Sequence, residues 1–438
     1  MRPRWLLAVT LLAACLATAS SSASTMELYG FGARSIGLAG TSEAVAEDYF
    51  ATYSNPANLA LARRVHFGLG GHLVANSFAV DRVGGQERYP TELPADLVTG
   101  HLGVSAPLGG WLANRLAIGI AMHIPIGSPT QITSRDYRTP QVVLYDSIGD
   151  RLVVAFGVGA RLLDWLSIGV SAQLLASLEG SAELHLSALE QRFTSKELDI
   201  DLLSRLYPIV GMTLHPGDNF RFALVWRAAA QVDYRLPLEV FVEELGALQF
   251  TIAGVGLYSP DSFVAASSWR FGDRALLTAA ATWARWSRMP PLAPDLAVDM
   301  GGEQLGPGGE QLRLLHVRST QIAMAAKDIV VPRVGFELRQ SPWWRWRAGL
   351  RYRPTPFPKA DGSANYLDAA ATTVAFGGTL ALHDEEEIAR RPLQVDIALG
   401  WTRLSRRTVD KRDPADPIGG TSLHGGSWRL ALTLHHDF

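Results

Sequence analysis

The chain has 438 residues and a formal net charge of −2 at pH 7, so it lacks the basic excess that would hold a nucleic-acid backbone. Charged residues make up only 19% of the sequence, yet no stretch after the N-terminus has about 18 apolar residues in a row, which excludes a helical membrane protein. Two classes remain: a large soluble β protein, and a transmembrane β-barrel, in which apolar and polar residues alternate.

Residues 1–23 predict an export signal peptide. Two arginines precede an apolar stretch, and a run of small residues ends at Ala23, where we expect cleavage. The only cysteine, Cys15, lies inside this segment. Its surroundings would also suit lipoprotein processing, but a barrel gains little from one lipid anchor. The mature chain is therefore expected to have no disulfide and no thiol chemistry.

Residues 24–64 show no alternating pattern. Their glycines allow tight turns, and the stretch 41–50 could form a short helix. A barrel of fourteen strands, the number that the following residues indicate, is too wide to be filled by the side chains of its wall. We therefore expect this segment to be a hatch that plugs the lumen; the alternative is a periplasmic arm.

From residue 65 to residue 438 the sequence consists of short segments in which apolar residues recur at every second position, as strands require. The clearest segment runs from Leu116 to Ile124. The pattern recurs fourteen times, and the segments average about 9 to 11 residues, the length that a tilted strand needs to cross a bilayer. They begin near Val65, Leu97, Leu116, Leu152, Leu166, Tyr207, Phe220, Ser262, Arg274, Val330, Arg345, Ala371, Leu393 and Trp428.

The connections between these segments alternate in length. Connections after even-numbered segments are short, and those after odd-numbered segments are long: roughly 80–96, 125–150, 187–206, 229–261, 287–329, 354–370 and 405–427. A soluble sandwich has no reason to keep this parity, whereas outer-membrane barrels have short periplasmic turns and long external loops. The sequence therefore predicts an all-β fold, a 14-stranded antiparallel transmembrane β-barrel over residues 65–438, located in the bacterial outer membrane.

The aromatic residues support a barrel. Most tryptophans, Trp286 among them, lie at or near segment ends, where a ring can sit in the headgroup layer. The last segment has an apolar face that runs from Trp428 to the terminal Phe438, which resembles the C-terminal signal of bacterial outer-membrane proteins. His436 stands where an apolar residue is more usual. The barrel-assembly machinery is thus an expected partner through the Phe438 strand.

Several motifs along the chain resemble the FadL-type channels, the outer-membrane family that admits long-chain fatty acids and aromatic hydrocarbons. The motifs are Gly-Ala-Arg-Ser-Ile-Gly-Leu-Ala-Gly from residue 32, Tyr-Ser-Asn-Pro-Ala from residue 53, Pro-Arg-Val-Gly-Phe-Glu-Leu from residue 332, Arg-Ala-Gly-Leu-Arg-Tyr-Arg-Pro-Thr-Pro from residue 347 and Asn-Tyr-Leu-Asp from residue 365. Each is weak alone, but their order and spacing are specific together.

The resemblance implies a fourteen-stranded barrel closed by an N-terminal hatch, with an Asn-Pro-Ala element in the lumen that moves when ligand binds. By position, Asn55, Pro56 and Ala57 would be this element. The residues themselves indicate a plainer role, because Asn-Pro favours a fixed turn and asparagine can cap a following helix.

Two of the long connections are unusually apolar, and an exposed apolar patch marks an interaction site. In the resembling family such loops offer a first hydrophobic groove to ligand outside the cell. The alternative is that the loops cover each other over the barrel mouth. The candidate groove residues are Leu189, Phe193, Leu202, Leu238, Phe241 and Leu245.

Arginines recur at positions expected to face the lumen. A guanidinium can form a bidentate pair with a fatty-acid carboxylate, and Arg161, Arg347 and Arg351 are the candidates for this role. Most lumen arginines are instead expected to pair with acids such as Glu337, Asp396 and Asp437, which would hold the wall together.

The motifs of hydrolases, zinc proteases and P-loop enzymes are absent, so we expect no catalysis, cofactor or metal site. The expected function is passive outer-membrane uptake of hydrophobic compounds, most of all long-chain fatty acids, through a monomeric channel in contact with outer-membrane lipid. Ligand would bind the apolar loops, enter the lumen and leave past the hatch. The alternatives are a secretion or assembly partner barrel and, less favoured, a lipid-modifying enzyme.

Overall fold

A computed structural model describes residues 30–83, 91, 93–126, 139–146, 152–187, 192–242, 246–291, 295–305, 311–318, 324–359, 362, 364–382, 391–411, 416 and 418–438. For residues 146, 176–187, 192–204, 232–254, 256–257, 295–305 and 311–318 the description covers the backbone only. The signal peptide that the sequence predicts lies outside the described residues.

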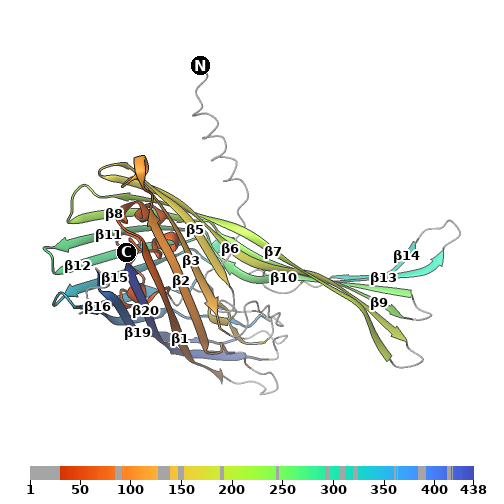
Figure 1. Cartoon of the computed structure of the whole chain (residues 1–438). Coiled ribbons are helices and arrows are strands. Elements are labelled where there is room, and N and C mark those ends of the chain that lie inside the picture. Colours follow the sequence, from red (N-terminus) through yellow and green to blue (C-terminus); the bar gives the residue numbers. More distant parts are fainter. Residues whose placement is uncertain are drawn as a thin grey trace.

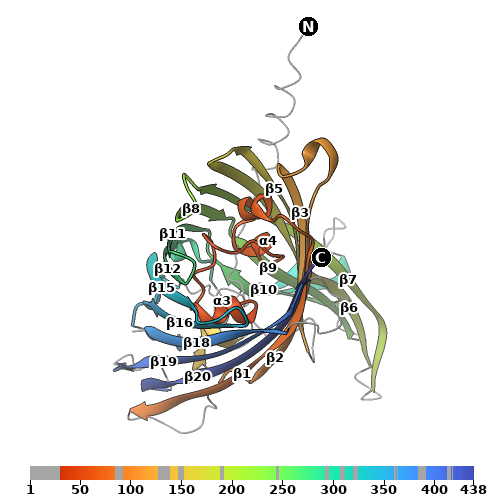
Figure 2. The same ribbon diagram turned by 60° about the vertical axis from the view of Figure 1, so that its left-hand side comes forward.

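Fourteen of the described strands form a closed antiparallel barrel (Figures 1 and 2). Each strand pairs with its neighbours in chain order, and the last closes on the first, with His66 opposite Asp437 and Val83 opposite Gly420. The strands are β1 (His66–Val83), β2 (Leu97–Pro107), β3 (Leu116–Pro125), β5 (Val153–Leu163), β6 (Leu166–Ser187), β7 (Arg192–Leu214), β8 (Phe220–Arg227), β11 (Ser262–Phe271), β12 (Ala275–Ala284), β15 (Ile329–Arg339), β16 (Trp344–Arg353), β18 (Ala371–Leu382), β19 (Leu393–Val409) and β20 (Gly420–Asp437).

Alternation along each strand separates the two faces of the wall. In β3, Ile118 and Ile120 are exposed on the outside, while Ala117, Ala121 and His123 are buried inside. This arrangement is inverted relative to a soluble protein, because the apolar face of a membrane barrel meets lipid and the small and polar residues face the lumen. The fourteen strands and their membrane-facing pattern are those that the sequence predicts.

Two strands of the wall begin earlier than the sequence predicts. β7 begins at Arg192 rather than near Tyr207, and β20 begins at Gly420 rather than near Trp428. The strands are longer than a bilayer crossing requires, so their pairing continues beyond the wall on the side of the long connections. A prediction that takes membrane thickness as the strand length misses such extensions.

The long connections 187–206, 229–261 and 287–329 are largely strands, not loops. They contain β9 (Ala230–Val242), β10 (Gly246–Ser259), β13 (Asp295–Leu305) and β14 (Gln311–Arg318). Together with the outer parts of β6 and β7 these strands form an arm that extends away from the barrel (Figure 1). In it β9 pairs with β6 in parallel, and β10 links β9 to β13.

Four of the predicted groove residues lie on the strands of this arm. Phe193 and Leu202 belong to β7, and Leu238 and Phe241 belong to β9, in stretches where only the backbone is described. The other two, Leu189 and Leu245, lie outside the described residues. The apolar groove therefore remains a prediction.

Residues 30–62, here called the N-terminal segment, lie inside the barrel (Figure 2). The segment contains α3 (Ala33–Gly37), α4 (Ala51–Ser54) and the 3-10 helix η1 (Pro56–Leu61). The predicted helix over 41–50 is wrong, because this stretch forms turns, and the helix begins only at Ala51. Helix α3 contacts β16, β18, β19 and β20, whereas η1 contacts β2, β3, β5, β6 and β7.

At the rim with the long connections, several chain segments fold together over the lumen, and we call them the loop cap. The cap contains β4 (Gln141–Val142), α5 (Val143–Asp146) and β17 (Tyr366–Leu367), and β4 pairs with β17 in parallel. The 3-10 helix η3 (Trp286–Arg288) adjoins it, and η2 (Gly110–Leu112) lies in a short turn at the opposite rim.

None of the helices in the described part of the chain is long and apolar enough to cross a membrane.

Candidate functional site

A cavity lies in the lumen between the N-terminal segment and the loop cap. Its lining combines the N-terminal segment with residues from β8, β12, β15, β16, β18, β19 and β20. The lining residues on which the argument depends are Gly40, Glu43, Tyr53, Ser54, Leu144, Arg227, Thr282, Trp286, Ile329, Val331, Arg333, Arg351, Arg353, Thr373 and Arg429.

One side of the cavity, toward the loop cap, is apolar. Leu144 of the cap and Trp286 line it beside Ile329 and Val331 of β15. The indole of Trp286 packs against the ring of Phe357, with centroids 6.0 Å apart, and is almost wholly buried. The prediction that Trp286 sits in the headgroup layer is wrong, because η3 turns the ring inward. Such a surface offers an alkyl or aromatic ligand contact without unsatisfied polar groups.

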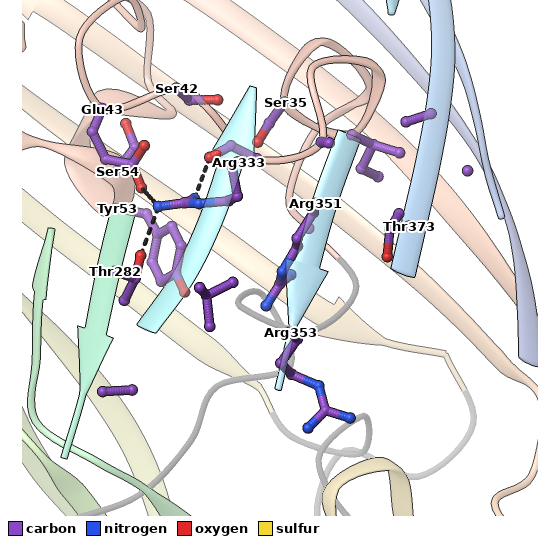
Figure 3. Close-up of a pocket in the computed structure, with 18 of the residues that line it drawn as sticks. Ser35, Ser42, Glu43, Tyr53, Ser54, Thr282, Arg333, Arg351, Arg353 and Thr373 are labelled. Atoms are coloured by element: carbon purple, nitrogen blue, oxygen red, sulfur yellow. Dashed lines mark hydrogen bonds and ion pairs between the residues drawn. The ribbon is translucent and has the colours of Figure 1, made fainter. Parts of the chain in front are cut away.

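The other side of the cavity is basic. The described lining contains five arginines and a single acidic residue, Glu43. Arg333 of β15 stands directly opposite Arg351 of β16, and two like charges at paired positions repel each other. The strand period of two places Arg353 on the same face as Arg351, so positive charge runs along β16 toward the cap (Figure 3). This surface favours an anionic group.

Several of these arginines have well-defined partners, and Arg429, for example, donates to the hydroxyls of Thr373 and Thr402. Arg353 forms a bidentate pair with Asp368 of the loop cap, at 2.8 and 3.0 Å. Arg333 donates to the Glu43 carboxylate at 2.9 Å and to the hydroxyl of Thr282 at 2.7 Å, and its other nitrogen bonds the carbonyl of Gly40 (Figure 3).

Arg227 donates to the carbonyl of Ser54 at 2.9 Å and lies 5.2 Å from the centre of the Tyr53 ring. The wall arginines thus hold both the cap and the N-terminal segment.

Of the three arginines predicted to bind a carboxylate, the structure places only Arg351 in the cavity, where its side chain lies between those of Arg333 and Arg353 (Figure 3). Arg161 lies near a short turn and donates to the carbonyl of Asp164 at 3.0 Å. The third candidate, Arg347, belongs to a separate ion-pair network.

The Arg347 guanidinium is buried between two lumen acids, 2.7 Å from Glu337 and 3.0 Å from Asp396. It makes the wall-stabilising pairs that the sequence predicts for most lumen arginines. Arg34 of the N-terminal segment joins the network at 3.2 Å from Glu337, and this carboxylate raises the pKa of the Arg34 guanidinium. Asp437 differs from the prediction, since its near neighbour is His66 at 3.9 Å.

The Asn-Pro-Ala element fixes the N-terminal segment to the wall. The side-chain oxygen of Asn55 accepts from the backbone of Ala57 at 3.1 Å, which caps η1, and Pro56 occupies its first turn. The Asn55 amide donates at 2.8 Å both to Thr213 of β7 and to the backbone carbonyl of Glu43. The capping role that the residues indicate is confirmed. The Asn55 side chain also links η1 to β7 and to the turn that contains Glu43.

Glycines of the wall make room for this contact. A Cβ atom on Gly169 would lie 2.2 Å from the carbonyl carbon of Pro56, and one on Gly211 would lie 2.0 Å from Oδ1 of Asn55. Gly68 and Gly103 accommodate the ring of Tyr49 in the same way. Burial of that ring raises the pKa of the Tyr49 phenol, which therefore stays neutral at physiological pH.

Sequence reasoning did not single out Glu43 or these glycines. Glu43 is almost fully buried, and its partners Arg227 and Arg333 are far away in the chain. The only available signal was the recurrence of glycine on the lumen face of neighbouring strands, as at Gly119 and Gly169. The described residues contain no group of three or more His, Cys, Asp or Glu side chains that could hold a metal ion.

Solved structures with the same fold are outer-membrane channels. A Pseudomonas aeruginosa FadL homologue is 14% identical, with a TM-score of 0.57, over 96% of this chain and 100% of that chain. The Pseudomonas putida toluene transporter TodX is 16% identical, with a TM-score of 0.57, over 94% and 99%. The monoaromatic hydrocarbon channel CymD is 16% identical, with a TM-score of 0.56, over 95% and 99%.

Comparison with curated protein sequences finds no match. The family model described as outer membrane protein transport protein (OMPP1/FadL/TodX) matches residues 13–431, nearly the whole chain. Together with the fourteen-stranded barrel, this match shows that the chain belongs to the OMPP1/FadL/TodX family of outer-membrane transport proteins.

Proposed function

We propose that the protein is a passive channel for uptake of hydrophobic compounds and that its preferred substrates are long-chain fatty acids. The observation that carries this proposal is the lumen cavity, which has an apolar side near Trp286 and Val331 and a basic side around Arg351. A molecule with an alkyl chain and a carboxylate matches both sides at once. A neutral hydrocarbon would offer no anionic group to the basic side.

In this proposal the ligand first binds apolar residues of the external arm and then enters the lumen. The N-terminal segment acts as the hatch, since it fills the barrel below the cavity, and its movement lets the ligand leave. The outer membrane has no ATP, so the concentration gradient drives the flux. The relatives described as toluene and monoaromatic hydrocarbon channels support transport of hydrophobic compounds in general.

The carboxylate preference can be tested by uptake in cells that lack other channels of this family. Hydrogen bonds to charged groups contribute about 1.5 to 3 kcal/mol. We therefore expect Arg351→Ala to weaken the uptake of labelled oleate at limiting concentration by about tenfold or more while toluene uptake changes little. Arg161→Ala is the matched control, because this arginine lies outside the cavity and should leave both uptakes unchanged.

Equal loss of oleate and toluene uptake in Arg351→Ala would argue against a carboxylate site. If neither uptake changed, the cavity would have no part in recognition of the head group.

A further inference from the structure

The carboxylate of Glu43 joins the N-terminal segment to two arginines of the wall. Its Oε1 atom is 2.9 Å from Arg333 of β15 and 3.9 Å from Arg227 of β8. The side chain is 3% exposed, and the other oxygen, Oε2, is buried with no hydrogen-bond partner. One carboxylate thus serves two guanidinium groups, and half of its accepting capacity is unused.

Two guanidinium groups share one carboxylate, so among the described residues the site is short of one anion. Two arginines in a buried, polar pocket are balanced best by two carboxylates, because an incompletely neutralised buried charge is costly. Arg333 and Arg227 both line the cavity that Glu43 also lines, so an anion that enters the cavity can reach them. Thr282 stands at 2.7 Å from Arg333 and would remain its partner during an exchange.

The backbone at Glu43 is connected to the rest of the N-terminal segment. Its carbonyl accepts from the side chains of Asn55 and Asn58, at 2.8 and 2.9 Å. Both asparagines also bond Thr213 of β7. A shift of residue 43 therefore acts on the bonds that fix the Asn-Pro-Ala element to the wall.

We propose that Glu43 is a carboxylate-exchange latch: the carboxylate of an incoming ligand takes its place on Arg333, Glu43 turns to Arg227, and the N-terminal segment loosens. After the exchange each arginine has one carboxylate, so no charge is left unpaired. This inference rests on the proposed function, and it adds a specificity step to it.

The latch distinguishes ligands by charge after they have bound. A neutral molecule with the same chain can occupy the apolar side of the cavity, but it has no group to replace Glu43 on Arg333. It therefore binds without releasing the N-terminal segment.

The test measures access to a buried position of the N-terminal segment in the purified mature barrel. The chain's only native cysteine, Cys15, lies in the predicted signal peptide, so Ala46→Cys introduces a single reporter thiol. Ala46 is 4% exposed and does not line the cavity. We expect oleate to raise the rate of maleimide labelling at position 46 several-fold, and methyl oleate, which has the same chain without the charge, to leave it unchanged.

Two further variants each remove one partner of the Glu43–Arg333 ion pair. Glu43→Gln keeps the volume of the side chain and removes its charge, and Arg333→Gln removes the receiving group. Each should raise labelling in the absence of ligand to about the level that oleate produces in the parent, with no further response to oleate. Glu47→Gln is the matched control, because this residue forms another glutamate–arginine pair of the segment, with Arg221 at 2.5 Å, outside the cavity. It should respond to oleate like the parent.

Heat-modifiable migration shows whether each variant forms the barrel, and equilibrium dialysis with labelled oleate measures ligand binding. The latch is wrong if oleate binds but does not change labelling, if methyl oleate raises labelling equally, or if Glu43→Gln keeps the parent's labelling rate and oleate response. Failure of oleate to bind the parent at all would contradict the proposed function and, with it, the latch.

Discussion

At the scale of single residues, the position of the N-terminal segment depends on glycines of the wall, which have no side chain in the way. Gly169 and Gly211 face Pro56 and Asn55 so closely that an added methyl group would overlap atoms of the segment's backbone or of its fixed side chain. Backbone atoms cannot move aside like the end of a flexible side chain. Close approach of the segment, rather than turn formation, is therefore the reason for glycine at these positions.

The first prediction follows from this contact. Gly169→Ala and Gly211→Ala should each displace η1 from the wall, so the barrel still assembles but small polar solutes leak through it. Liposome swelling with a small sugar measures the leak. Gly100→Ala is the control, because a Cβ atom there would lie 3.8 Å from its nearest neighbour, an ordinary contact. Equal swelling rates for all three variants would show that the segment does not depend on these glycines.

At the scale of elements, buried ion pairs hold the loop cap against the wall. Arg353 at the end of β16 binds Asp368 through two hydrogen bonds, and Lys411 lies 3.3 Å from Asp416 with both side chains almost fully buried. The cap also packs through a buried apolar cluster that includes Leu144, Phe357 and Tyr366. The cap is therefore an ordered part of the structure, and it lies on one side of the cavity while the N-terminal segment lies on the other.

Asp368→Asn tests this role of the cap. The loss of charge-assisted hydrogen bonds should destabilise the cap by about 1.5 to 3 kcal/mol, so protease should cut residues 354–370 faster while the barrel itself stays intact. Asp81→Asn removes an exposed carboxylate that lies 3.4 Å from Arg406 and 3.0 Å from His424, and it should have almost no effect on the cap because surface ion pairs contribute about 0 to 1 kcal/mol. Unchanged cleavage in Asp368→Asn would mean that packing, not the ion pair, holds the cap.

At the scale of the whole molecule, the short turns lie at one rim and the long connections at the other. Phe438 lies at the rim of the short turns, where its backbone bonds Val65. In an outer-membrane barrel this rim faces the periplasm. The loop cap and the arm are then external, and the N-terminal segment is reached from outside only after the cap has been passed.

This orientation predicts the labelling of two exposed positions. In intact cells an impermeant maleimide should label Lys359→Cys, in a long connection, and leave Asp218→Cys, in a short turn, unlabelled. After the outer membrane is permeabilised, both should react. Labelling of Asp218→Cys in intact cells would reverse the orientation.

The sequence predicts the wall well because period-two alternation is a local property that each strand shows by itself. The arm could not be predicted. Alternation identifies β9 and β13 as strands, but it does not show that both pair with β10 in the arm instead of entering the membrane. Arg351 could be assigned to the lumen from its position in β16. Glu43 could not be found, since its role depends on Arg333, 290 residues later in the chain.

The contacts of the N-terminal segment have a consequence for assembly. Its η1 packs on β3, β5, β6 and β7, and its α3 packs on β16, β18, β19 and β20, so one short stretch joins strands from the first and the last parts of the chain. The segment is also tethered directly to β1, the strand on which β20 closes the circle. Strands from both ends of the chain must therefore be in place before the segment can complete its contacts, so its docking belongs to a late stage of barrel closure.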